Sequence, residues 1–147
     1  VDDIESAGLA LTNAKYIAKA TGSSLMLLHV VTPENPLVIS DEHLAGVHAA
    51  AAVIEQAQRD ESVHLADQQL KLQAAADELA SDGVSISAEA VLGNANDEIV
   101  RAVKDSGAGL VILATHGRRG VSRAFLGSVA DGVVHDVDVP VMLVNRS

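Results

Sequence analysis

The sequence predicts an α/β domain with a doubly wound, open parallel sheet. Short apolar segments alternate along the chain with longer segments whose apolar residues recur at helical spacing. The hydrophobic content of 48% is almost wholly aliphatic, with one Tyr, one Phe and no Trp, and aliphatic strands covered by helices are typical of parallel sheets. A length of 147 residues suits one domain, residues 1–147.

The first half of the chain predicts two helical regions on either side of one strand. Residues 5–21 carry Ala and Leu at helical spacing and are followed by a glycine, which often ends a helix. The short apolar run 23–31 favours a buried strand, and two prolines make 32–40 a loop. Residues 41–81 are rich in Ala, Gln, Leu and Glu, and predict one long helix or two helices joined near Asp60.

The second half predicts three strands separated by helices. Apolar and polar residues alternate over 84–91, which favours a strand near the sheet edge. Residues 93–107 read as a turn and a helix, 110–114 as a buried strand, 128–136 as a short helix and 139–144 as the last strand. This alternation predicts right-handed βαβ units and hence parallel strands.

The chain opens on a predicted helix, whereas a doubly wound sheet normally opens on a strand that is usually central. Only Val1 and Asp2 are left where that strand should end. We therefore expect the first strand of the fold to lie upstream of Val1.

Composition argues against several classes of function. A net charge of −10 has the wrong sign for binding duplex nucleic acid, and the scarcity of aromatic rings argues against a platform for single strands. The chain has no cysteine, no apolar run of about 18 residues and no signal peptide. We expect a cytoplasmic protein that binds neither nucleic acid nor membrane.

The stretch "LVILATHGRRGVSRAFLGSVADGV", residues 110–133, interrupts the most apolar segment with glycines and arginines. In a parallel sheet, ligands bind beyond the carboxyl ends of the strands, which is where this loop begins. Gly127 and Ser128 then start a helix whose free N–H groups favour an anion. The alternative is a purely structural capping box formed by Ser128 and Asp131.

Charge favours the anion site. The 25 residues between Asp105 and Asp131 contain no acid, although the chain has 20 Asp and Glu in total. Arg118, Arg119 and Arg123 lie in the same window. A cationic segment on an acidic protein is what phosphate recognition requires.

Residues 114–144 resemble the C-terminal half of a universal stress protein, and the resemblance covers nearly the whole chain. ATP-binding members of that family carry Gly-x2-Gly-x9-Gly-Ser/Thr. Here nine residues separate Gly117 from Gly127 and Ser128, and Ala114 stands at the first glycine. The resemblance implies a Rossmann-like fold of the adenine nucleotide alpha hydrolase type, with five parallel strands once the first is restored.

The resemblance also implies positions for ATP. Asp2 would lie near the adenine or ribose, Val30 would bond adenine through its backbone, and the strand end from Leu113 would line ribose and phosphates. With the loop arginines, the expected site comprises Asp2, Val30, Leu113, Ala114, Thr115, His116, Gly117, Arg118, Arg119, Gly127, Ser128 and Val129.

We expect no metal site built by the protein alone, because the six histidines show no clear ligand spacing, apart from His43 and His48 near two acids. Mg²⁺ carried by nucleotide phosphates is the expected ion. No catalytic residue is assigned: Ser122 and Ser128 are candidate phosphoryl acceptors without an evident base, and slow ATP hydrolysis stays open.

The final strand is apolar on both faces, and Pro140 indicates an edge strand. In the resembling family this strand mediates dimerisation, so we expect a homodimer through Val139, Val141, Leu143 and Val144. The expected function is ATP binding that changes dimer contacts or contacts with an unknown protein partner. A nucleotide-free signalling scaffold and a binder of AMP or cyclic AMP are the alternatives.

Overall fold

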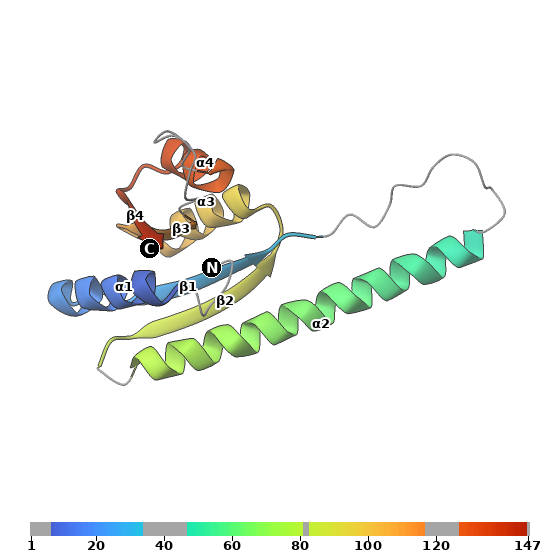
Figure 1. Ribbon diagram of the computed structural model, residues 1–147, viewed down its shortest axis with the longest axis horizontal. Helices are drawn as coiled ribbons and strands as arrows, with labels where there is room; N and C mark the ends of the chain where they lie inside the picture. Colours follow the sequence, from blue (N-terminus) through green and yellow to red (C-terminus); the bar gives the residue numbers. More distant parts are fainter. Residues whose placement is uncertain (1–6, 34–46, 81–82, 117–126, 147) are drawn as a thin grey trace.

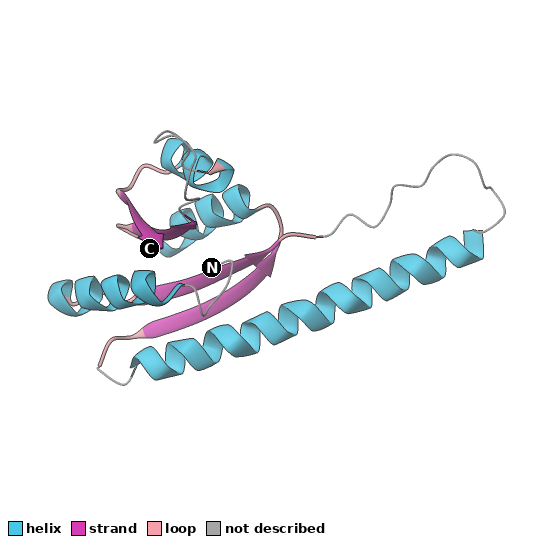
Figure 2. Ribbon diagram, viewed as in Figure 1, coloured by secondary structure: helices cyan, strands magenta, loops and turns pink. Residues whose placement is uncertain are grey.

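The computed structural model describes residues 7–33, 47–80, 83–116 and 127–146. Helices alternate with strands, and the paired strands are parallel (Figures 1 and 2), which confirms the α/β class. The described elements are α1 (Gly8–Thr21), β1 (Leu25–Val31), α2 (Val47–Ala80), β2 (Ile86–Leu92), α3 (Ala95–Ser106), β3 (Val111–His116), α4 (Ser128–Asp136) and β4 (Val141–Arg146).

The four described strands form two parallel pairs, and the single sheet that we expected includes a further, central strand upstream of Val1. β1 pairs with β2 from Leu25 opposite Ile86, and β3 pairs with β4 from Val111 opposite Val141. A sheet is continuous only where neighbouring strands share backbone hydrogen bonds, and no strand in the described ranges joins β1 to β3. The central strand that we expected to end at Asp2 falls outside those ranges.

Helix α2 is one continuous helix of 34 residues, which decides between the two alternatives for this region. At 1.5 Å per residue it is about 51 Å long, whereas the seven residues of β2 span about 23 Å. One part of the helix therefore follows β2 and the rest extends past it (Figure 1). The packed part carries Leu72 and Ala76, which form the buried cluster of the core with Leu27.

Helix α1 contacts both sheets, with contacts to β1, β3 and β4. Its buried residues, Ala10, Ala14 and Ala18, recur every four positions and so form one stripe of small side chains. The helix ends at Gly22, whose φ of 67° lies in the left-handed region and whose N–H donates to the carbonyl of Ala18. No helix within the described ranges combines the length and the apolar character needed to cross a membrane.

Candidate functional site

The strand predicted at 110–114, which leads into the expected phosphate loop, is longer than expected. We predicted that it ends at residue 114, but β3 runs on to His116 because β4 also continues, to Arg146, and supplies backbone partners. Leu113, Ala114 and Thr115 are therefore strand residues, and each is half-buried. The strand therefore ends two residues later than the sequence indicated.

Val30 lies at the carboxyl end of β1, opposite Val91, and is half-buried. It belongs to a different sheet from Ala114. Asp2, Gly117, Arg118 and Arg119 lie outside the described residues, as do Ser122 and Arg123.

The start of α4 argues against a capping box formed by Ser128 and Asp131. The cap residue is Gly127, with φ 79° and ψ 147°, and it has no side chain with which to cap the helix. Ser128 is the first helical residue and is exposed, and the N–H of Asp131 donates to the carbonyl of Gly127 at 3.0 Å. Ser128 therefore does not act as the N-cap of a capping box. The first turn instead presents backbone N–H groups at an exposed end, next to the exposed Val129.

Gly127 is one of four described glycines with a positive φ. A φ of 79° is strained for any residue with a Cβ, although an added Cβ would meet no atom within 4 Å. Open space around a strained glycine lets a ligand approach the backbone closely.

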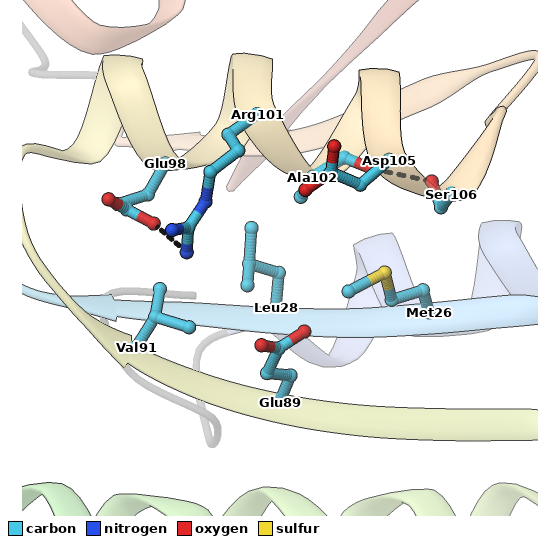
Figure 3. A pocket seen from close by; sticks show the side chains of 9 residues that line it. All are labelled: Met26, Leu28, Glu89, Val91, Glu98, Arg101, Ala102, Asp105 and Ser106. Atoms are coloured by element: carbon cyan, nitrogen blue, oxygen red, sulfur yellow. Dashed lines mark hydrogen bonds and ion pairs between the residues drawn. The ribbon is translucent and has the colours of Figure 1, made fainter.

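A separate cavity of about 250 Å³ lies between α3 and the β1–β2 sheet. Figure 3 shows that Met26, Leu28 and Val91 reach it from the strands, while Arg101 of α3 forms an ion pair with Glu98. The cavity is also lined by Glu89, Ala102, Asp105 and Ser106. No residue of the predicted site lines it, and it is smaller than typical pockets for small molecules, so we do not assign a nucleotide to it.

A second, more open hollow of about 470 Å³ lies where α3 meets the end of α4. Its lining includes Asn96, whose amide donates to Asp136 at 2.6 Å, and the charged residues Arg101 and Lys104. The residues that line these two cavities were not identified from the sequence as functional candidates. At the first cavity, the ion pair of Glu98 and Arg101 could have been predicted from their helical spacing of three residues. Within the described ranges, no three His, Cys, Asp or Glu side chains gather closely enough to hold a metal ion.

The chain is similar to known proteins in both sequence and structure. The model of the universal stress protein family matches residues 1–145. Universal stress protein MJ0577 of Methanocaldococcus jannaschii is 27% identical over 148 residues, covering 99% of this chain and 91% of the relative. The solved structure of MJ0577 superposes with a TM-score of 0.73 at 24% identity, covering 97% of this chain and 90% of that one.

Two further solved structures contain adenine nucleotides. A universal stress protein in complex with cAMP matches with a TM-score of 0.62 at 21% identity, over 100% of this chain and 93% of that one. A universal stress protein family protein from Arabidopsis thaliana with AMP bound matches with a TM-score of 0.57 at 21% identity, over 97% and 79%.

Proposed function

Because the chain belongs to the universal stress protein family, we propose that it binds an adenine nucleotide and that ATP, with Mg²⁺ on its phosphates, is the ligand. The observation that carries this proposal is the start of α4, where a helix begins at a left-handed glycine without a side-chain cap. Such a helix end offers N–H donors and a positive dipole to a phosphate. Two similar proteins with AMP or cAMP bound support the ligand class.

We propose that the adenine end of the nucleotide lies at the end of β1 and its phosphates lie at α4. Val30 would offer backbone groups to the base, Ala114 and Thr115 would line the ribose, and Ser128 would donate to phosphate. Asp2, Leu113, His116, Gly117, Arg118, Arg119, Gly127 and Val129 complete the proposed site. Gathering these groups around one ligand requires the ends of β1 and β3 to lie near each other, although the two strands belong to separate sheets.

The proposed role is regulatory. Phosphoryl transfer requires a positioned nucleophile as well as a phosphate cradle, and we assign no general base to Ser128. We infer that nucleotide occupancy changes dimer contacts or contacts with a partner protein in the cytoplasm.

Calorimetric titration with ATP, with and without Mg²⁺, tests the proposal. Gly127→Val should abolish binding, because the branched side chain disfavours the left-handed backbone and stands where phosphate would approach. Gly109→Ala is the matched control, since this glycine has no positive φ and open space around it, and it should bind as the unchanged protein does. If Gly127→Val retains full affinity, the proposed site is wrong.

The nucleotides in the similar structures favour a second candidate, a binder of AMP or cAMP. The same titration separates the candidates, because a phosphate cradle at α4 should favour ATP over AMP, and a site for cAMP should favour the cyclic form. Absence of heat with all three nucleotides would instead support a nucleotide-free scaffold.

We also propose a homodimer in which β4 pairs across a two-fold axis through Val139, Val141, Leu143 and Val144. The N–H of Val111 donates to the carbonyl of Pro140, so alternate residues starting from Pro140 face β3, and Leu143 directs its N–H away from β3. Leu143→Pro removes that outward donor while leaving the pairing with β3. Sedimentation should then show a monomer, and a dimer that persists would rule out this interface.

A further inference from the structure

The side chain of Gln69, on α2, is hydrogen bonded to the backbone of β2 at two points. Its Nε2 donates to the carbonyl of Ala88 at 3.0 Å, and its Oε1 accepts from the N–H of Ala90 at 2.7 Å. A residue of a parallel neighbouring strand makes this same pair of bonds, one to each of two residues that flank a third. The glutamine amide thus takes the place of one residue of an added strand.

These bonds are on the outer edge of β2. The N–H of Leu25 donates to the carbonyl of Ser85, and the N–H of Gly93 donates to the carbonyl of Val31. Since successive residues of a strand point their backbone groups to opposite neighbours, the positions in register with Ser85 and Gly93 face β1. Ala88 and Ala90 therefore face away from β1, toward the side where a further strand would add.

Packing fixes the glutamine in this place. Leu72 and Ala76 lie three and seven residues further along α2, on the same side of the helix, and both are buried at 1% exposure. Alanine is depleted in strands, yet Ala88 and Ala90 flank the centre of β2. Their small side chains leave room for the amide of Gln69 to reach the backbone, and Figure 1 shows α2 running alongside β2.

We propose that Gln69 is an edge lock: it occupies the backbone groups at the middle of the β2 edge and so prevents that edge from pairing with the β2 edge of a second copy. An unlocked strand edge is a template for pairing with another chain. A second copy is the relevant partner because it brings an identical edge, and two such edges pair about a two-fold axis. The lock directs assembly of the protein to another surface.

The test compares Gln69→Ala with Gln73→Ala in the full chain. Gln73 is on the same helix, but its amide donates to Asp77 on the exposed surface, so its replacement leaves β2 untouched. In Gln69→Ala the amide hydrogen of Ala90 should exchange about five-fold faster, as expected for the loss of one net hydrogen bond. Sedimentation of Gln69→Ala should reveal a species larger than that of the unchanged protein, with mass that rises with concentration, and Gln73→Ala should match the unchanged protein.

A double variant, Gln69→Ala with Ala90→Pro, separates an edge effect from a loosened helix. Proline removes the outward N–H at the centre of the edge, so the larger species should disappear. Helix α2 lacks the two bonds of Gln69 in both variants, so any loosening of the helix should be the same in each. If Gln69→Ala loses helical circular dichroism, Gln69→Leu keeps the side-chain volume without the two bonds and should give the same result. The proposal would be overturned if Gln69→Ala had the same mass in sedimentation as the unchanged protein. It would also be overturned if the larger species remained in the double variant with Ala90→Pro.

Discussion

At the scale of single residues, the contact between α3 and α4 depends on one amide and one glycine. A Cβ at Gly132 would lie 2.8 Å from Oδ1 of Asn96, and the same amide donates to Asp136 at 2.6 Å. Gly132→Ala gains about 1 kcal/mol of helix propensity, but it must displace Asn96 and lose a bond of about 1 kcal/mol or more. We expect no net stabilisation.

Denaturant unfolding of a double-mutant cycle checks this expectation. With Asn96→Ala in place, Gly132→Ala should become stabilising by about 1 kcal/mol, because the obstacle is gone. An equal effect of Gly132→Ala in both backgrounds would show that the two residues are not coupled.

His135 gives the molecule a pH dependence at the end of α4. The carbonyl of Asp131, 2.8 Å from Nδ1, and next the carboxylate of Asp131 raise the pKa of His135 above its usual 6.5. Burial acts on this pKa in the opposite direction, and the carboxylate of Asp136 adds the smallest increase. A raised pKa means that the folded state holds the proton more tightly. This contribution is complete below the unfolded-state pKa and is lost as pH rises through the folded-state value.

We therefore expect the stability difference between the unchanged protein and His135→Ala to be larger at pH 5.5 than at pH 8.5. The imidazole resonances of His135 should titrate above 6.5. A resonance that titrates at or below 6.5 would contradict the assignment.

At the scale of elements, the start of α3 depends on its cap. Oδ1 of Asn94 accepts from the N–H of Asn96 at 3.0 Å and of Asp97 at 3.3 Å. Asn94→Ala leaves both donors without that acceptor and should lower the free energy of unfolding by about 1 kcal/mol. Asn94→Asp keeps an acceptor and should restore most of it, as measured by denaturant unfolding. Equal losses in both variants would mean that the cap is not the cause.

Elements with a strong local signal were the ones that the sequence predicted well. The helix predicted at 128–136 is α4 without a change of boundary, since Gly127 precedes its start and Pro140 follows its end by a few residues. The hydrogen bonds of Gln69 to β2 had no such local signal, because its partners, Ala88 and Ala90, are about 20 residues away and contribute only backbone atoms. Likewise, β3 extends beyond the apolar segment of the sequence. Backbone pairing with β4, and not the character of the side chains, determines where β3 ends.

At the scale of the whole molecule, the sequence predicted parallel strands, and the described strands form two parallel pairs. Hydrophobic pattern identifies a buried strand, whereas continuity of a sheet depends on backbone pairing between segments far apart in the chain. Helices contact both of the described strand pairs. Helix α1 links the two strand pairs, because it contacts β1 of one pair and both β3 and β4 of the other.

The stripe of alanines on α1 makes this role testable. Ala18 is 2% exposed, so a larger side chain there must push the helix away from the strands. Ala18→Leu should cost about 1–3 kcal/mol of unfolding free energy. Ala20→Leu is the matched control, since Ala20 is on the same helix and exposed, and it should stay within about 0.5 kcal/mol.

Hydrogen exchange extends the test to both sheets. If α1 couples the two strand pairs, amides of β1 and β3 should lose protection together in Ala18→Leu, because displacing the helix loosens both contacts at once. Loss confined to one sheet would mean that the other is held by different contacts, such as those between α3 and α4. Full protection in both sheets would show that α1 contributes little to holding them together.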